Sequence, residues 1–256
     1  MWALITGASS GIGRDMARYL CDLGYNLVIT SSSRSIRELK GLKKELSKYV
    51  EVVAVSLDLS KDNAPYKLYT FCKSKKIDID ILINNAGFGV FGSFDETSLK
   101  DELNLINVNI KALHILTKLF LKDLKAKNYG YILNVSSSAG FMTGPLLSSY
   151  YASKNYVLRL SLAIREELRR EGSKVHISVL CPGPVDTNFN NRAGVSFSIK
   201  PLTSEYVSKC AIDGMFNNRG IIIPSISMKL GVFATRFVPY ELMSKITYNI
   251  QKDKLK

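Results

Sequence analysis

The segment TGASSGIG, from Thr6 to Gly13, joins the apolar run WALIT (residues 2–6) to the helical pattern GRDMARYLCDLG (residues 13–24). Glycines in such a turn let the backbone bend sharply and approach a ligand closely. The N-terminus of the following helix then favours an anion such as a pyrophosphate. Glycine turns also join strands to helices in proteins that bind no phosphate, so the rest of the chain must support this interpretation.

Six further short apolar runs follow: NLVIT (26–30), EVVAVS (51–56), IDILIN (79–84), YILNVS (131–136), HISVLC (176–181) and GIIIP (220–224). They are continuously apolar, as is typical of strands buried on both faces, and connections of roughly a dozen residues or more separate them. Helical patterns cover residues 34–49, about 100–127 and 149–171. We therefore predict an α/β fold, a parallel sheet of seven strands with helices on both faces.

The chain has 256 residues, of which 46% are hydrophobic and 22% charged, enough for one sizeable core. Because no internal repeat or linker interrupts it, we expect one domain over residues 1–256. Within it we expect a cofactor-binding and catalytic core in residues 1–190 and a substrate loop with helices in 188–218. The amphipathic, basic extension 225–256, interrupted by Pro239, is expected to be a lid or a subunit contact, with a membrane surface as the alternative.

The formal net charge of +13 raises the possibility of a nucleic-acid partner. However, no nucleic-acid recognition motif is present, and basic and acidic residues alternate in segments such as RELKGLKKEL, which is typical of a solvated helix face. We expect no nucleic-acid partner and interpret the charge as a diffuse field that attracts anionic ligands.

Cysteines and histidines are sparse and scattered, which predicts free thiols, no metal site and no Ser-His-Asp triad. The residues are Cys21, Cys72, Cys181, Cys210, His114 and His176. No charged leader or signal-type apolar segment precedes MWALIT, and the charge-free stretch 130–153 contains six serines and Pro145, unlike a membrane helix. A cytoplasmic protein without an integral membrane segment is expected.

The end of the second apolar run, TSSSR (30–34), lacks the carboxylate that would bind the ribose diol of NAD. Without it a 2′-phosphate is not repelled, and hydroxyls and a guanidinium are available to hold one. NADP(H) is therefore favoured over NAD(H), which stays possible. The proposed phosphate ligands are Ser31, Ser32, Ser33 and Arg34, with Arg14 and Arg37 as further candidates.

In YYASK, Tyr150 and Lys154 are four residues apart, which places them on one face of a helix. A nearby cation lowers the pKa of a phenol from about 10, so the pair could exchange a proton with a substrate oxygen. Such pairs also occur by chance on helix surfaces. The preceding segment NVSSSAG (134–140) offers Ser136, Ser137 and Ser138 as hydroxyl donors.

The whole series of motifs resembles the short-chain dehydrogenase/reductase family, in its three-glycine TGxxxGxG and YxxxK form. TGASSGIG, LDL (57–59), NNAG (84–87), NVNIKAL (107–113), NVSSSAG, YYASK and PGPVDT (182–187) occur in the family's order and at its usual spacings. The resemblance selects Ser137, which lies 13 residues before Tyr150, and Tyr150 rather than Tyr151. It also implies a Rossmann-type doubly wound sheet with the strand order 3-2-1-4-5-6-7.

The resemblance implies the roles of these residues. Tyr150 would transfer the proton, Ser137 would hold the substrate oxygen, Lys154 would tune Tyr150 and bind the ribose, and Asn109 would hold a water that leads from Lys154 to solvent. The implied cofactor-binding residues are Gly7, Ser9, Ser10, Gly11, Ile12, Gly13, Ser31, Ser32, Ser33, Arg34, Asp58, Leu59, Asn85, Ala86, Gly87, Tyr150, Lys154, Pro182, Gly183, Val185 and Thr187.

The function that this resemblance implies is NAD(P)-dependent reduction of a ketone or aldehyde to an alcohol, or the reverse. A hydrophobic substrate such as a steroid or fatty-acyl compound is expected, bound by the loop 188–205, residues 88–94, Phe141, Met142 and the C-terminal segment. The alternatives are a catalytically silent NADP-binding regulatory protein and a 3-oxoacyl-carrier-protein reductase. The helices around 100–127 and 149–171 resemble the family's four-helix dimer interface, so a homodimer or homotetramer is expected.

Overall fold

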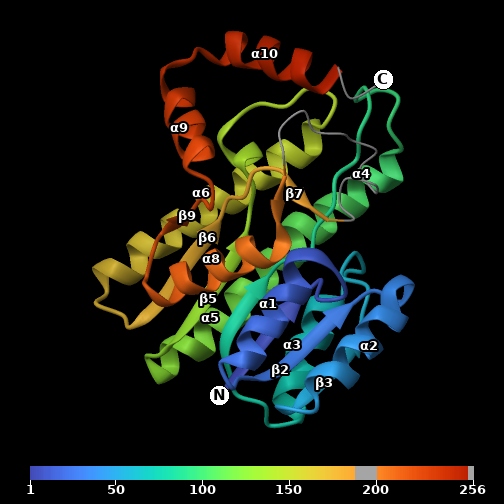
Figure 1. Ribbon diagram of the computed structural model, residues 1–256, viewed down its shortest axis with the longest axis vertical. Coiled ribbons are helices and arrows are strands. Elements are labelled where there is room, and N and C mark those ends of the chain that lie inside the picture. Colours follow the sequence, from blue (N-terminus) through green and yellow to red (C-terminus); the bar gives the residue numbers. More distant parts are fainter. Residues whose placement is uncertain (188–200, 253–256) are drawn as a thin grey trace.

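A computed structural model describes residues 1–187 and 201–252 and contains a seven-stranded sheet (Figure 1). Its order is β3-β2-β1-β4-β5-β6-β9, and every neighbouring pair is parallel. The predicted doubly wound sheet of order 3-2-1-4-5-6-7 is confirmed. The strands are β1 (Trp2–Thr6), β2 (Asn26–Ser31), β3 (Val52–Ser56), β4 (Ile79–Asn84), β5 (Gly130–Val135), β6 (Val175–Leu180) and β9 (Ile221–Ile222).

Helices cover both faces of this sheet. Ala3 and Ile5 of β1 pack toward α1 (Gly11–Asp22), α2 (Ile36–Leu46) and α8 (Ser204–Phe216). The intervening Leu4 packs on the other face, in the cluster that includes α3 (Ala64–Ser74), α5 (Leu113–Lys127) and α6 (Ser148–Arg170). Because successive side chains of a strand point to opposite faces, both sets must be apolar, which explains the continuous apolar runs.

The long helical patterns form largely as expected. The pattern at 149–171 is α6, and the pattern at 100–127 is α4 (Leu99–Ile106), a π-helical turn at Asn107–Ala112 and α5. Among the described residues, 3₁₀ turns form at η1 (Ser33–Ser35), η3 (Ser138–Phe141) and η4 (Thr235–Phe237). The π-helical turn, helix α3 and a small sheet of β7 (Val185–Asp186) with β8 (Leu202–Thr203) were not predicted.

The C-terminal extension forms α9 (Ile226–Ala234) and α10 (Tyr240–Lys252), with Pro239 between them. Figure 1 shows both helices beyond the end of the sheet, at the opposite end of the molecule from β3. Within residues 1–187 and 201–252, no helix has the length and apolar character needed to cross a bilayer.

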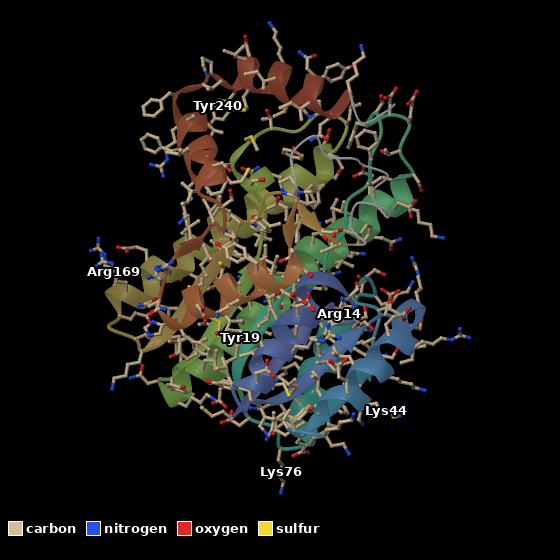
Figure 2. The ribbon with its side chains drawn as sticks, viewed as in Figure 1. Arg14, Tyr19, Lys44, Lys76, Arg169 and Tyr240 are labelled. Atoms are coloured by element: carbon tan, nitrogen blue, oxygen red, sulfur yellow. The ribbon has the colours of Figure 1, made fainter. Side chains whose placement is uncertain are left out.

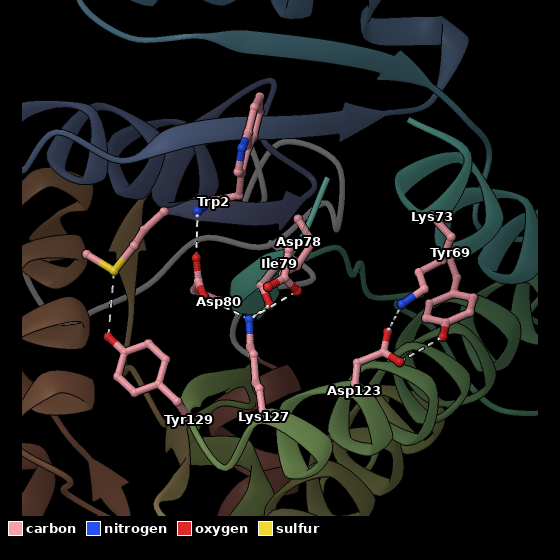
Figure 3. Close-up of polar contacts among 10 residues, drawn as sticks. Trp2, Tyr69, Lys73, Asp78, Ile79, Asp80, Asp123, Lys127 and Tyr129 are labelled. Carbon is pink, nitrogen blue, oxygen red and sulfur yellow. Dashed lines mark hydrogen bonds and ion pairs between the residues drawn. The ribbon is translucent and has the colours of Figure 1, made fainter. Parts of the chain in front are cut away.

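Polar contacts fasten the amino-terminal edge of the central strands (Figure 3). Lys127, at the end of α5, donates to the Ile79 carbonyl at 2.9 Å and to Asp80 Oδ1 at 2.8 Å, and its Nζ lies 3.1 Å from Asp78 Oδ1. Asp80 Oδ2 accepts from the Trp2 amide at 2.9 Å. These bonds connect β1, β4 and α5 at the edge opposite the carboxyl ends of the strands.

Candidate active site

A cavity of about 970 Å³ lies at the carboxyl ends of the parallel strands. Its wall is built from the segments that directly follow β1, β2, β3, β4, β5 and β6, together with parts of α4, α6, α9 and α10. This is the crevice in which doubly wound sheets bind their ligands. All the predicted site residues lie in the wall except Gly13, Ser33 and Asn109.

The glycine turn is shaped for close approach by a ligand. Gly7 (φ +66°) and Gly11 (φ +53°) adopt left-handed conformations that favour glycine. A Cβ on Gly7 would lie 2.9 Å from the Cα of Ala86, and one on Gly11 would lie 2.9 Å from a methyl of Thr187. Ser10, the N-cap of α1, makes no side-chain capping bond to the described residues. The first backbone N–H groups of α1 therefore suit a pyrophosphate.

Gly13 lies outside the cavity wall, where it packs against the Asn85 side chain and the Gly7 carbonyl. A Cβ there would lie 2.3 Å from Asn85 Nδ2 and 2.5 Å from the Gly7 carbonyl oxygen. The space is used by the Asn85 amide, which donates to the carbonyls of Thr6 (3.0 Å) and Gly7 (3.1 Å). Thr6 Oγ1 in turn accepts from the amides of Asn85 and Ala86, both at 3.0 Å. These bonds fix the turn to the end of β4.

At the end of β2, Ser31, Ser32 and Arg34 lie in the cavity wall, as predicted. Ser33 does not: it starts the 3₁₀ turn η1 and is exposed, and Ser35 takes a place in the wall instead. Ser33 therefore lies outside the wall, and its contact with a 2′-phosphate stays a prediction.

The two further candidate cations are also outside the wall. Arg14 Nε lies 3.5 Å from Asp15 Oδ1, and Arg37 is an exposed residue on α2. Of the three arginines considered for a 2′-phosphate, Arg14, Arg34 and Arg37, Arg34 is the one that lies in the cavity wall.

Asp58 and Leu59, after β3, both lie in the wall. Burial raises the pKa of the Asp58 carboxyl, but hydrogen bonds from Ser60 and the charges of Lys61 and Arg34 outweigh this effect and lower it. The Ser60 amide donates to Asp58 Oδ1 at 3.0 Å. Asp58 is therefore a carboxylate at neutral pH, on the same side of the cavity as Arg34.

Ser137, Tyr150 and Lys154 converge on the cavity between β5 and α6. Ser137 is hydrogen-bonded to the Tyr150 hydroxyl, and its Oγ also accepts from the Ala139 amide at 3.1 Å. Lys154 Nζ donates to the Val135 carbonyl at 2.9 Å and lies 5.7 Å from the centre of the Tyr150 ring.

The neighbouring serines have different surroundings. Ser136 Oγ donates to the Lys154 carbonyl at 2.7 Å and is buried, so it holds η3 and β5 against α6. The Ser138 amide donates to the Pro182 carbonyl at 2.8 Å. Among the three serines, Ser137 is the one whose hydroxyl bonds to Tyr150.

Burial dominates the protonation of this group. It raises the pKa of Tyr150 to about 12, and the hydrogen bond with Ser137 lowers it by a smaller amount. Burial also lowers the pKa of Lys154 to about 8. The pKa of Tyr150 is therefore raised rather than lowered as predicted, because burial removes water from the phenolate.

Asn109 lies in the π-helical turn behind the cavity wall and is buried. Its amide bonds to both backbone groups of Phe88, accepting at 3.1 Å and donating at 2.9 Å, and it donates to Ser153 Oγ at 3.0 Å. A Cβ on Gly87 would lie 3.0 Å from Asn109 Oδ1 and 3.3 Å from Lys154 Nζ. Asn109 is thus adjacent to Lys154, and its role in holding a water stays a prediction.

The segment after β6 closes the cavity. Pro182, Gly183, Val185 and Thr187 all lie in its wall. The predicted substrate loop 188–205 lies mostly outside the described residues, which resume at residue 201.

The rest of the wall is largely apolar, and several predicted substrate-binding residues are found there, among them Phe88 and Met142. Phe141 is not: the 3₁₀ turn η3 directs it to a separate small cavity next to α9, so that prediction is wrong. Phe94 is 70% exposed and also lies outside the wall.

Sequence reasoning did not single out Gln251 of α10. Gln251 is 2% exposed, lies in the cavity wall and donates from Nε2 to the Tyr151 hydroxyl at 2.6 Å. Its Oε1 has no hydrogen-bond partner among the described residues. The spacing of Met243, Thr247 and Gln251, all buried, was the available signal for the inward face of this helix.

The sequence profile of the family described as "short chain dehydrogenase" matches residues 1–195. A probable short-chain type dehydrogenase/reductase, VdlC, of Helicobacter pylori is 36% identical over 75% of this chain and 67% of its own. A very-long-chain 3-oxoacyl-CoA reductase of Pyrenophora tritici-repentis is 35% identical over 67% of this chain and 51% of its own. Human 17-beta-hydroxysteroid dehydrogenase type 3 is 33% identical over 73% of this chain and 59% of its own. The chain therefore spans about half to two thirds of these relatives.

Solved structures of short-chain dehydrogenases have a fold similar to that of this chain. A short-chain dehydrogenase from Sphingobium yanoikuyae in complex with NADPH has a TM-score of 0.82 and 26% identity, over 92% of this chain and 93% of that one. A short-chain dehydrogenase/reductase from Burkholderia phymatum in complex with NAD has a TM-score of 0.81 and 25% identity, over 91% of both chains. With its sheet order, its glycine turn and the profile match over residues 1–195, this chain belongs to the short-chain dehydrogenase/reductase family and is an oxidoreductase with a Rossmann-like nucleotide-binding fold.

Proposed function

We propose that this protein reduces a ketone or aldehyde to an alcohol with NADPH, or catalyses the reverse reaction. One observation supports this most directly: the hydrogen-bonded hydroxyls of Ser137 and Tyr150, next to the buried Lys154, share a cavity with the glycine turn. A proton donor and an oxygen-binding hydroxyl therefore lie beside a site suited to a nucleotide.

The residues present fit a nicotinamide dinucleotide. The left-handed glycines and the start of α1 suit its pyrophosphate, and the cavity extends from Arg34 to Tyr150. When bound there, NADPH would supply the hydride that reduces the carbonyl carbon.

Tyr150 would donate the proton to the carbonyl oxygen. Burial raises the pKa of Tyr150 to about 12, so the phenol is protonated at neutral pH and has a proton to donate in the reductive direction. Ser137 would donate a hydrogen bond to the same oxygen and stabilise its developing charge. The ammonium of Lys154 would stabilise the phenolate that Tyr150 becomes.

NADPH is preferred over NADH in this proposal because Thr30–Arg34 contains no carboxylate, and Ser31, Ser32 and Arg34 face the cavity. The related solved structures include complexes with NADPH and with NAD, so the preference rests on these residues of the chain itself.

We propose a large, mainly apolar carbonyl substrate. Phe88, Met142, Leu147 and Met228 line the cavity, and the relatives include a very-long-chain 3-oxoacyl-CoA reductase and a 17-beta-hydroxysteroid dehydrogenase. Gln251 Oε1, which has no hydrogen-bond partner within residues 1–187 and 201–252, would accept a hydrogen bond from a hydroxyl or N–H group of the substrate.

A carbonyl panel tests this proposal, with consumption of NADPH and of NADH followed by absorbance. The panel pairs steroid, fatty-acyl and aryl ketones that carry a distal hydroxyl with the matched compounds that lack it. We expect turnover with NADPH and a preference for the hydroxylated member of a pair. Cofactor binding without turnover of any carbonyl, or of any alcohol in the reverse direction, would instead support the silent regulatory protein.

We also propose a homodimer or homotetramer formed through α4, α5 and α6. Leu99, Leu103 and Ile106 follow at helical spacing along α4 and are 72%, 51% and 40% exposed, and Tyr156 on α6 is 36% exposed. Light scattering after size-exclusion chromatography should show an oligomer for the native chain and a smaller species for Leu103→Glu. A monomeric native chain would rule this interface out.

A further inference from the structure

Helix α9 presents an apolar stripe to solvent. Ile226, Leu230, Phe233 and Phe237 follow at i, i+4, i+7 and i+11 along α9 and η4, and they are 76%, 67%, 56% and 73% exposed. Residues at this spacing share one side of a helix. The buried residue of α9 is Val232. The helix therefore directs most of its apolar surface away from the protein core.

Helix α10 has a similar exposed stripe beside its buried one. Its buried residues are Met243, Thr247 and Gln251, of which Thr247 and Gln251 line the cavity. Leu242 and Ile246, which are 50% and 42% exposed, begin a second stripe at i and i+4 that continues at i+8. Figure 2 shows a further aromatic residue of this surface, labelled Tyr240, at the bend between the two helices.

We define the C-terminal apolar surface as Ile226, Leu230, Phe233, Phe237, Tyr240, Leu242, Ile246 and Ile250. Its charges are mainly of one sign. Within residues 226–252 there are four basic residues and one acidic residue, Glu241. Arg236 lies over the Phe233 ring, with its guanidinium carbon 5.9 Å from the ring centre. Exposed cations thus stand among exposed apolar and aromatic side chains.

We propose that the C-terminal apolar surface binds the surface of an anionic phospholipid bilayer. Amphipathic helices with aromatic and aliphatic residues on one face and cations beside it bind in the plane of the membrane interface. A bilayer of this kind satisfies both features at once: its acyl boundary takes up the apolar side chains and its phosphates attract Lys229, Arg236, Lys245 and Lys252. Neither described helix is suited to cross the bilayer, so both would lie on it.

The same two helices border the cavity. Met228 of α9 and Thr247, Ile250 and Gln251 of α10 line its wall. A bilayer held against α9 and α10 would lie beside this end of the cavity, so an apolar compound dissolved in the membrane could enter with little exposure to water. The membrane interaction itself does not depend on the proposed reaction.

Vesicle co-sedimentation tests the proposal with the full-length chain. One set of vesicles contains phosphatidylcholine alone, and the other contains phosphatidylcholine with phosphatidylglycerol. We expect the native chain to bind the anionic vesicles, and salt to weaken this binding. Lys229→Gln and Arg236→Gln should each weaken it about fivefold. The double variant Phe233→Ser/Phe237→Ser should bind roughly a hundredfold more weakly, since two aromatic side chains no longer enter the interface.

The control is Tyr49→Ser, which removes an aromatic side chain that is 76% exposed at a site outside the C-terminal extension. It should bind vesicles like the native chain, and circular dichroism should show all variants folded. The proposal is overturned if the native chain stays unbound at low salt or if the double phenylalanine variant binds as well as the native chain. It is also overturned if that variant converts an oligomer to a monomer while neither form binds vesicles, because the surface would then be a contact between copies of this chain.

Discussion

Tyr150 is the residue on which the proposed reaction depends most directly. Tyr150→Phe removes the proton donor and leaves the buried ring in place, so kcat should fall roughly a hundredfold to ten-thousandfold. The phenol is not required to hold the pyrophosphate at the glycine turn, so NADPH affinity should stay nearly unchanged. Steady-state kinetics and fluorescence titration with NADPH measure the two quantities.

Tyr151→Phe is the matched control, because it removes the hydroxyl of the adjacent tyrosine. That hydroxyl accepts a hydrogen bond from Gln251 and lies beside the substrate end of the cavity. The control should change kcat by at most a few-fold. Normal reductase rates for Tyr150→Phe would contradict the proposed mechanism.

Lys154 should determine the alkaline limit of the reaction. Burial lowers its pKa to about 8, so the ammonium loses its proton as the pH rises through this value. The cation then no longer stabilises a developing Tyr150 phenolate, and kcat/KM for carbonyl reduction should decline above pH 8. A pH profile of the native enzyme checks this, and Lys154→Met should be slow and lack this decline. A flat native profile across that pH would exclude the role given to Lys154.

The same shift predicts how stability depends on pH. The folded-state pKa of Lys154 is about 8 and the ordinary value is 10.5, so between them the unfolded chain binds more protons. The free energy of unfolding should therefore rise with pH in this window. Burying the charged ammonium of Lys154 lowers this free energy by roughly 3 kcal/mol, and that loss is fully present below pH 8. Urea unfolding of the native chain and of Lys154→Met should show a difference that changes in this direction on the alkaline side of pH 8. An unchanged difference would mean that Lys154 titrates normally.

Motif spacing identified Ser137, Tyr150 and Lys154 as neighbours, and the structure brings them together. The spacing could not predict how they titrate, because burial depends on packing between β5 and α6. It also could not predict the outward position of Ser33, which follows from a three-residue 3₁₀ turn.

At the scale of elements, Gly13 controls how the glycine turn joins β4. Gly13→Ala would place a Cβ 2.3 Å from Asn85 Nδ2 and displace the amide that bonds to Thr6 and Gly7. We expect a loss of about 2 to 4 kcal/mol in the free energy of unfolding from overpacking and lost hydrogen bonds. NADPH affinity should also fall, although Gly13 lies behind the cavity wall. Urea denaturation and cofactor titration measure both effects.

Gly41→Ala is the control for this change. Gly41 lies within α2, and among the described residues a Cβ added there would meet no atom within 4 Å beyond its own helix and chain neighbours. The substitution should therefore stabilise the protein by about 0.5–1 kcal/mol and leave NADPH affinity unchanged. If Gly13→Ala behaved like Gly41→Ala, the close packing of the turn against Asn85 would be refuted.

The strands and most helices could be predicted because their apolar patterns are long and regular. Helix α3 was not predicted, since its buried stripe consists of Ala64, Leu68 and Cys72 with Pro65 in the first turn. The π-helical turn was not predicted either. Its segment has the same helical periodicity as its neighbours, whereas Asn109 within it is bonded to Phe88, far away in sequence.

For the whole molecule, the position of the C-terminal extension could not be read from the sequence. Its amphipathic pattern indicated helices, and both are present on either side of Pro239. Which face meets the cavity depends on how α10 packs over α6 and the segments next to it, as the bond from Gln251 to Tyr151 shows. The spacing of Met243, Thr247 and Gln251 marks the buried face of α10, but no local pattern shows on which segment that face packs.

Cofactor binding should stabilise the whole fold, because the cavity joins segments that follow six different strands. At a hundredfold excess over Kd, NADPH should add about 2.7 kcal/mol to the free energy of unfolding, which for a chain of this size corresponds to a rise of roughly 5–10 °C in Tm.

At equal concentration NADH should raise Tm less, since it lacks the phosphate that Arg34 would bind. Arg34→Ala should weaken NADPH binding by roughly ten- to a hundredfold and leave NADH binding unchanged, which removes most of the difference. Arg37→Ala changes an exposed residue outside the wall, so this variant should keep the difference in Tm between the NADPH and NADH complexes. Differential scanning fluorimetry of the three proteins with each cofactor decides the matter: a native chain stabilised equally by NADH and NADPH would show that the excess positive charge near β2 does not select a 2′-phosphate.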